Sequence, residues 1–569
     1  MDLDSMEGVQ AHVGAWLQRL VNPDLDFSFT DPANPKFIGL RDAVTLIPDG
    51  AVVGCTALGS NQQSGLVYMA IRRVFEETGH PRNLTVIVTG GCGGRGKLPG
   101  TIDDLGVEGL VTRFFSGHLE TFRAIKSLAA EGKLELQCIP QGTFSHLVHA
   151  LAQGQDSVVN TIGVGTFMDP RVGRGTPVNG AHYPQYVALE ENQFRYSCPK
   201  FDVAIFNLPA ADRAGNLYSR GSSMVGEAQD LVRAARNNGG ITIANVGLLV
   251  EPGYGDIFIP AEDVDHIIYH PDTTQSATFT HENNFPAFTL ESQEDTDVAL
   301  GRVRRINDML GITPMRCQAD DVLARLAATI FAEHAHPGDS VDIGVGLPEV
   351  VSRLLYESGL MAQLTMINES GVFGGVAAPG IFFGASVNPD EIVPSSEAFR
   401  RIYKRLDSVI LGVLQADSDG NVNVSKRGEG PNNYVGPGGF IDLTQSARQV
   451  YFCSSWMAKG SILFENGRAH IEKAGALKFT DKVDEITFSG KEAVKRGQEV
   501  FYISHVGAFR LTPRGMEMTH IMPGIDVRKD ILDAIPMKLH IADSLQVVSP
   551  EIISGVNFTL EFAKRSPRA

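Results

Sequence analysis

The segment at residues 367–375 combines a single carboxylate, Glu369, with three closely spaced glycines. Residues 364–367, directly upstream, are typical of the end of a buried strand. The glycines remove side-chain bulk, so a ligand can approach the backbone closely. A carboxylate in this position can act as a covalent nucleophile. The alternative from the residues alone is an acid that caps the turn after a strand.

The same segment resembles the active-site glutamate motif of the family I CoA-transferases, and most closely that of the single-chain acetate, propionate and short-chain acyl-CoA transferases. The similarity extends from about residue 36 to about residue 541. Five further motifs fit this family in the same order along the chain: residues 141–143 (QGT), 163–171 (GVGTFMDPR), 415–417 (QAD), 436–442 (GPGGFID) and 509–513 (FRLTP).

The resemblance implies a ping-pong transfer of CoA from an acyl-CoA to a free, short-chain carboxylate. Thiols have a pKa near ~8.5 and carboxylic acids one near ~4, so the tetrahedral intermediate tends to expel the attacking carboxylate again. In the implied route Glu369 attacks the acyl-CoA and forms an acyl-glutamyl anhydride. The released CoA thiolate then attacks the glutamyl carbonyl and leaves a glutamyl-CoA thioester. The acceptor carboxylate reverses these steps.

The resemblance also implies donors for the oxyanion of that intermediate. Gln141, which follows the apolar run at residues 134–139, would donate its side-chain amide. A backbone N–H of Gly438 or Gly439 would be the second donor. From the residues alone, a turn is the favoured interpretation of Gln141, and for the glycines a plain tight turn is an equal alternative. Residues 440–442, directly after the glycines, look like a strand.

Further contacts to the substrates are predicted from position in the chain. Asn61, in a loop after an apolar strand, is placed near the acyl carboxylate, with a helix N-cap as the alternative. A glycine-rich loop would line the path of the pantetheine chain, through Gly374, Gly375, Phe383 and Gly384. The alternative for the phenylalanine is ordinary core packing.

Short Val- and Ile-rich runs alternate with helical patterns, as at residues 84–88 (a strand) and 323–330 (an amphipathic helix). This alternation predicts an α/β fold with mostly parallel sheets covered by helices. An apolar strand followed by an Asp/Gly/Asn turn occurs at residues 202–216 and again at 408–421, which predicts two related open α/β domains. The resemblance places the active site at their interface.

A chain of 569 residues is too long for one core. We expect an N-terminal appendage at residues 1–35, a first CoA-transferase domain at 36–313 and a second at 314–569 that carries Glu369. The boundary is set near Thr313, after the helix-like stretch at residues 299–310. Related enzymes are usually oligomers of a single chain, so a homo-oligomer, a dimer or a tetramer, is expected.

Composition and charge exclude several other classes. A net charge of −17 argues against nucleic-acid binding and requires a local basic or helix-terminus site for any anionic ligand. Without an apolar run that could span a bilayer or a secretory signal, we expect no membrane partner and a cytoplasmic location. The six cysteines form no CxxC pair, and the histidine pairs at 146/149 and 334/336 lack a carboxylate at metal spacing. We therefore expect no metal and no tightly bound cofactor, with CoA acting as a substrate.

Three alternatives stay open at this point. Residues 91–97 nearly spell a phosphate-binding loop, but Leu98 stands where Ser or Thr should hold magnesium, which disfavours nucleotide hydrolysis. The basic cluster at residues 400–405 is either a contact for CoA phosphates or a solvated helix face. The function itself has two rivals, an acyl-CoA hydrolase of the same fold and an acyl-carrier-protein transferase subunit of a decarboxylase.

Overall fold

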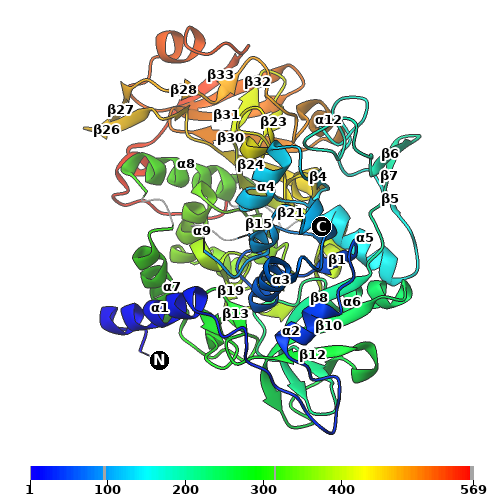
Figure 1. The fold of residues 1–569 in the computed structure, drawn as a ribbon. Helices are drawn as coiled ribbons and strands as arrows, with labels where there is room; N and C mark the ends of the chain where they lie inside the picture. Colours follow the sequence, from blue (N-terminus) through cyan, green and yellow to red (C-terminus); the bar gives the residue numbers. More distant parts are fainter. Residues whose placement is uncertain (1, 94–97, 313–315, 564–569) are drawn as a thin grey trace.

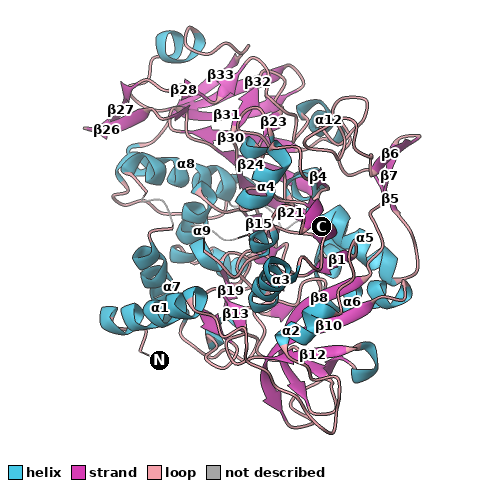
Figure 2. Ribbon diagram, in the orientation of Figure 1, coloured by secondary structure: helices cyan, strands magenta, loops and turns pink. Residues whose placement is uncertain are grey.

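The computed structural model describes residues 2–93, 98–312 and 316–563, and two large sheets, one from each half of the chain, dominate this part (Figure 1). Helices lie against the strands in both halves (Figure 2). The described helices are α1 Met6–Val21, α2 Leu40–Thr45, α3 Gly65–Thr78, α4 Arg123–Ala130, α5 Gln141–Ala152, α6 Ala228–Asn237, α7 Thr296–Leu310, α8 Gln318–His334, α9 Leu347–Glu357, α10 Ser395–Lys404, α11 Phe440–Ser446, α12 Gly490–Arg496 and α13 Pro550–Ser554.

The first sheet has nine strands, and those in the order β12-β10-β8-β1-β2-β3-β4 all run parallel. Two short strands, β9 and β11, add antiparallel pairs. Its strands are β1 Val52–Cys55, β2 Leu84–Val88, β3 Val111–Ser116, β4 Glu135–Cys138, β8 Val203–Asp212, β9 Leu217–Tyr218, β10 Ile241–Val250, β11 Ile257–Ile259 and β12 His266–Tyr269.

The second sheet has ten strands around the parallel set β16-β15-β21-β24-β30. Antiparallel strands lie on both sides of this set, and β33 pairs parallel with β32. Its strands are β15 Ser340–Ile343, β16 Thr365–Asn368, β17 Val372–Phe373, β20 Glu391–Ile392, β21 Leu406–Gly412, β24 Ala447–Cys453, β30 Glu499–Ser504, β31 Gly507–Thr512, β32 Gly515–Ile521 and β33 His540–Val547.

Shorter strands pair outside these two sheets: β5 Val158–Asn160, β6 Val187–Glu190, β7 Gln193–Tyr196, β13 Thr274–Ser276, β14 Phe279–Thr280, β18 Val376–Ala377, β19 Ser386–Val387, β22 Gln415–Asp417, β23 Val422–Asn423, β25 Met457–Ala458, β26 Ser461–Glu465, β27 Arg468–Lys473, β28 Ala476–Leu477 and β29 Phe479–Thr480. The predicted α/β class with mostly parallel sheets is confirmed. In Figure 1, β1, β15 and β21 lie in the middle of the molecule, between β12 and β33.

The repeated Asp/Gly/Asn turn has the same geometry in both halves. Asp212 accepts hydrogen bonds from the backbone N–H and the side-chain amide of Asn216, at 2.9 and 3.0 Å. Asp417 accepts the same pair from Asn421, at 2.9 and 3.1 Å. In the first sheet β1 lies between β2 and β8, and β8 ends at this turn. In the second sheet β15 lies between β16 and β21, and the short strand β22 follows β21 before the turn. The two halves therefore share a local topology, as the repeat predicted.

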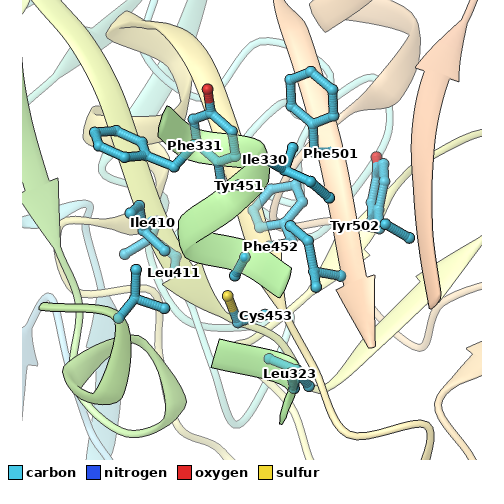
Figure 3. Packing of buried hydrophobic residues seen from close by; sticks show 14 of the residues in the cluster. Leu323, Ile330, Phe331, Ile410, Leu411, Tyr451, Phe452, Cys453, Phe501 and Tyr502 are labelled. Atoms are coloured by element: carbon cyan, nitrogen blue, oxygen red, sulfur yellow. The ribbon is translucent and has the colours of Figure 1, made fainter. Parts of the chain in front are cut away.

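A helix packs on the second sheet where the sequence predicted one. The amphipathic pattern at residues 323–330 lies inside α8, and Figure 3 shows Leu323, Ile330 and Phe331 among the side chains of β21, β24 and β30. The ring of Phe331 meets that of Tyr451 edge-on at 5.5 Å. This apolar contact fixes the position of the second sheet relative to its helical layer.

Residues 440–442 were expected to be a strand, and this prediction is wrong. They form the first turn of α11, in which the N–H of Leu443 donates to the carbonyl of Gly439 at 2.9 Å. Phe440 and Asp442 are both buried, so the apolar run reflects burial rather than strand periodicity. An acidic residue in the first turn also favours a helix, because the helix dipole is positive there.

The opening segment packs on the body of the protein. Val9, Val13 and Trp16 of α1 are buried in an apolar cluster that also contains Phe279 and residues of α7. His12 makes a 3.0 Å hydrogen bond to the hydroxyl of Thr278. The predicted domain limits stay predictions, and the boundary at Thr313 lies outside the described residues.

Candidate active site

Glu369 stands directly after β16, where the chain turns sharply into β17. The N–H of Gly371 donates to the carbonyl of Asn368 at 2.9 Å, and Gly371 has a φ of +95°. A Cβ at this position would lie 2.0 Å from the carbonyl oxygen of Val393, so glycine is required there. The turn therefore fixes the direction in which the Glu369 side chain leaves the sheet.

Gln141 and the glycine pair meet across the two halves of the chain. Gln141 is the first residue of α5, directly after β4, and its N–H donates to the carbonyl of Gly438 at 3.0 Å. The side chains of Gln141 and Glu369 lie close to these glycines. A Cβ added to Gly438 would lie 3.8 Å from Gln141 Oε1, and a Cβ added to Gly439 would lie 3.7 Å from Glu369 Cγ. Four of the predicted site residues are thus brought to the same place from distant parts of the sequence.

The two candidate glycine N–H groups differ in what they bind. The N–H of Gly438 donates to the carbonyl of Gly117 at 2.8 Å. No hydrogen bond joins the N–H of Gly439 to another of the described residues. Only Gly439 therefore has a backbone donor available to a ligand at this turn.

Two cavities adjoin Glu369. The first, which we call the glycine-loop cavity, has a volume of about 220 Å³ and is lined by Gln141, Glu369, Gly438 and Gly439 together with apolar side chains from both halves. The second, the arginine cavity, has a volume of about 180 Å³. Its basic side chains are Arg304, Arg316 and Arg353. Asp342, Glu369 and Phe383 line both cavities.

The buried carboxylate of Asp442, on α11, binds the start of α5 through hydrogen bonds. Asp442 accepts hydrogen bonds from the N–H of Gly142 at 3.0 Å, from the N–H of Thr143 at 3.1 Å and from the hydroxyl of Tyr403 at 2.6 Å. Burial raises the pKa of Asp442 to about 6, although these three donors act in the opposite direction. Because Gly142 follows Gln141 directly, the hydrogen bonds to Asp442 also hold Gln141 in place at the glycine-loop cavity.

Glu369 has a second carboxyl group beside it. Asp342 lies on β15, the strand next to β16, and is almost fully buried. Burial raises the pKa of Glu369. Burial, followed by the charge of Glu369 and a hydrogen bond to it, raises the pKa of Asp342 well above its usual range. Both carboxyl groups are therefore harder to ionise than free ones.

Two of the predicted contacts have other roles. Asn61 is fully buried, and its amide donates to the carbonyls of Leu58 at 3.1 Å and Phe383 at 2.8 Å, while the hydroxyl of Ser276 donates to its oxygen. These bonds hold the loop. Gly384 is packed against this amide, since a Cβ there would lie 3.0 Å from Asn61 Nδ2.

The glycine-rich loop approaches the cavities through only part of its length. Gly374 and Gly375 line neither cavity beside Glu369. A Cβ on Gly374 would lie 1.9 Å from Asp390 Oδ2, and one on Gly375 would lie 2.3 Å from the carbonyl oxygen of Val387, so local packing requires both glycines. Residues 376–379, which follow them, do line the arginine cavity.

The basic cluster at residues 400–405 and the phosphate-loop-like segment at residues 91–97 were left open by the sequence. Arg400 and Arg401 pair with glutamates on or beside their own helix and line neither cavity, as a solvated helix face would. Residues 94–97 of the phosphate-loop-like segment lie outside the described residues, whereas Gly91 and Gly93 line the glycine-loop cavity.

Among the described residues no three His, Cys, Asp or Glu side chains are grouped to hold a metal. In that same part of the chain, no helix has the length and apolar character that crossing a bilayer requires.

Three functional candidates were missed from the sequence. Asp342 was passed over as part of the apolar strand at residues 340–343, although an acid in a buried strand is itself a signal. Arg304 and Arg316 lie far from Glu369 in sequence, on α7 and just before α8, and no local pattern connects them with it.

Comparison with known proteins identifies the family. Residues 39–268 match the family model described as coenzyme A transferase. The caffeate CoA-transferase of Acetobacterium woodii is 34% identical over 537 residues, which cover 91% of this chain and 97% of the relative. The chain belongs to the family I CoA-transferases. It is an acyl-CoA:carboxylate CoA-transferase by membership, with CoA as a substrate, as the resemblance predicted.

Further relatives agree with this assignment. The acetate CoA-transferase YdiF of Escherichia coli K12 is 29% identical over 90% of this chain and 93% of its own length. The crystal structure of the YdiF apoenzyme from Escherichia coli O157:H7 superposes with a TM-score of 0.80 at 26% identity, covering 92% of this chain and 97% of that one. Another structure of that protein is described as a thioester complex with CoA.

The raised pKa of Asp442 predicts how stability depends on pH. Because the folded pKa of about 6 exceeds the reference value of 3.8, this carboxyl stabilises the fold most below pH 4 and contributes less as the pH rises through 6. The free energy of unfolding of the wild type relative to Asp442→Asn should therefore decrease by roughly 2 kcal/mol from pH 4 to pH 7. Urea denaturation at a series of pH values measures this difference.

Asp407→Asn provides the matched control. Burial alone would raise the pKa of Asp407, but hydrogen bonds from Ser340 and Arg405 lower it overall, so its contribution to stability increases with pH. A difference between the wild type and Asp442→Asn that stays constant over this pH range would contradict the prediction.

Proposed function

We propose that this enzyme transfers CoA from an acyl-CoA to a free carboxylate through covalent intermediates on Glu369. The observation that carries this proposal is the meeting of Glu369, the Gln141 side chain and the Gly439 N–H in one cavity. A nucleophile and two uncharged donors are the groups that acyl transfer through a tetrahedral intermediate requires.

The first half-reaction exchanges the acyl group for CoA on the enzyme. A carboxylate oxygen of Glu369 attacks the thioester carbonyl, the carbon–sulfur bond breaks, and CoA thiolate leaves an acyl-glutamyl anhydride. The thiolate then attacks the glutamyl carbonyl, which releases the acyl group as a carboxylate and forms the glutamyl-CoA thioester. The acceptor carboxylate runs the same steps in reverse.

Gln141 and Gly439 would stabilise the oxyanion in these steps. The side-chain amide of Gln141 lines the cavity and has no hydrogen bond to another described residue. Of the two glycines, Gly439 is the proposed donor because the N–H of Gly438 is already bound to Gly117. Donors held in place before the reaction stabilise developing charge without reorganisation.

The arginine cavity is the proposed path of CoA. Arg304 and Arg316 line it and form no ion pair with any described residue, while Arg353 pairs with Asp321 at 3.1 Å. A protein with a net charge of −17 needs such local cations to hold the phosphates of CoA. The apolar residues 376–379 and Phe383 then lead from these arginines to Glu369. Phe383 keeps its predicted place on the pantetheine path in this proposal.

The acyl group and the acceptor would occupy the glycine-loop cavity. Its volume of about 220 Å³ exceeds the ~150 Å³ of an apolar cavity that holds benzene. The short-chain preference therefore stays a prediction, and a small aromatic acid also fits by volume. The named relatives include both a caffeate and an acetate CoA-transferase. The homo-oligomeric state and the cytoplasmic location also stay predictions.

Removal of the nucleophile should abolish the exchange. We expect Glu369→Ala to lose all measurable CoA transfer and Glu369→Asp to keep only a trace, because its carboxylate falls about one bond short of the thioester carbon. Incubation with acyl-CoA alone should make the wild type sensitive to borohydride or hydroxylamine at the peptide that contains Glu369, as measured by mass spectrometry.

Glu76→Ala is the matched control, since this exposed glutamate pairs with Arg72 on the surface of α3. Near-normal exchange in Glu369→Ala would contradict the assignment. CoA release that does not depend on an acceptor acid would instead indicate the hydrolase. Reaction with a small acidic carrier protein but not with free CoA would indicate the carrier-protein transferase.

The proposed CoA path predicts a binding defect. Arg304→Ala and Arg316→Ala should each raise the KM for acyl-CoA about tenfold or more, the effect of losing one charge-assisted contact, with little change in kcat. Steady-state kinetics at several salt concentrations measure this effect, and Arg72→Ala is the surface control. An unchanged KM in both variants would place the phosphates elsewhere.

A further inference from the structure

Asp342 and Glu369 form a buried pair of carboxyl groups. β15 and β16 are parallel neighbours, with Asp342 opposite Ile367, so Glu369 follows just beyond the end of the same pair of strands. Asp342 is 2% exposed and lines both cavities that Glu369 lines. Asp342 Oδ2 is buried and has no hydrogen-bond partner among the described residues. A proton between the two groups supplies the missing partner.

We propose that Asp342 is a positioning residue that carries a proton at neutral pH and donates it in a hydrogen bond to the Glu369 carboxylate. The pair then holds one negative charge, and that charge lies on the nucleophile. This inference rests on the proposed function of Glu369 and adds a proton-holding partner to it.

The charged groups around the pair support placing the proton on Asp342 and the negative charge on Glu369. The pKa of Asp342 is raised by burial and by Glu369, and by no other group. The pKa of Glu369 is raised by burial and is lowered by its own backbone N–H and by Asp342. The other charged or titratable side chains that line the two cavities are Arg304, Arg316, Glu349, Arg353, His118 and Glu120.

A single charge has a consequence for catalysis. The tetrahedral intermediate carries an oxyanion beside Glu369, and a second carboxylate at Asp342 would repel it across a cavity with apolar walls. A protonated Asp342 avoids this repulsion and also orients Glu369. Activity of the wild type should therefore decline at alkaline pH, as Asp342 loses its proton.

Two substitutions separate hydrogen bonding from ionisation. Asp342→Asn keeps a donor towards Glu369 but cannot ionise, so we expect kcat within about threefold of the wild type at pH 7 and no alkaline decline caused by this pair. Asp342→Leu removes the donor, and its kcat should fall about 10- to 100-fold, the range for loss of a hydrogen bond to a charged group. Asp407→Asn, the same change in a buried aspartate of β21, should keep the alkaline decline of the wild type.

Infrared spectroscopy tests the proton without catalysis. The difference spectrum between wild type and Asp342→Asn at neutral pH should contain the band of a protonated, buried carboxyl group, and this band should disappear over the pH range of the alkaline decline. The measurement uses the free enzyme, so it does not depend on whether Glu369 becomes acylated.

The outcomes distinguish this inference from the proposed function. Absence of the carboxyl band, or an alkaline decline in Asp342→Asn equal to that of the wild type, would overturn the role of Asp342. A kcat as low in Asp342→Asn as in Asp342→Leu would do the same. If the wild type shows the carboxyl band but no borohydride-sensitive Glu369 peptide, the proposed nucleophile is wrong while the protonated pair stands.

Discussion

The contact between the start of α5 and the turn before α11 is the constraint on which the site depends. Gln141 donates its backbone N–H to Gly438, and Asp442 accepts the next two N–H groups of α5. These bonds join the two halves of the chain at the position where the candidate oxyanion donors lie. Together with the bond from the Gly438 N–H to Gly117, they hold the side chain of Gln141 and the N–H of Gly439 in a common geometry.

Burial has opposite effects on the two parts of this site. It strengthens the donors, because a hydrogen bond to an oxyanion is worth more where water is excluded. It also penalises the charge that Glu369 needs in its proposed role as a nucleophile, which is why the pKa of this group is raised. Asp342 offsets part of that penalty by donating a hydrogen bond, and its own retained proton prevents a second charge in the same cavity.

The sequence was sufficient for the fold class and for the residues that stand where strands end. Glu369 follows β16 and Gln141 follows β4, and such positions can be recognised from an apolar run with polar or glycine residues after it. The helix at residues 440–446 was misread as a strand because both kinds of buried element look apolar over a few residues.

What the sequence did not reveal are contacts between distant segments. Asn61 was expected to contact a ligand, but its partners Phe383 and Ser276 lie far along the chain and could not be known from the loop itself. Asp342 was missed for the same reason, since its significance depends on Glu369, which follows the neighbouring strand β16. Gly374 and Gly375 are required by packing against Asp390 and Val387, which local sequence does not show.

The proposed covalent role of Glu369 can be tested directly in a crystal structure of the enzyme frozen during turnover with acyl-CoA. The account predicts continuous density from the carboxyl carbon of Glu369 to the sulfur of CoA, with the pantetheine chain in the arginine cavity. A free Glu369 carboxylate, with CoA bound away from both cavities in an active crystal, would contradict it.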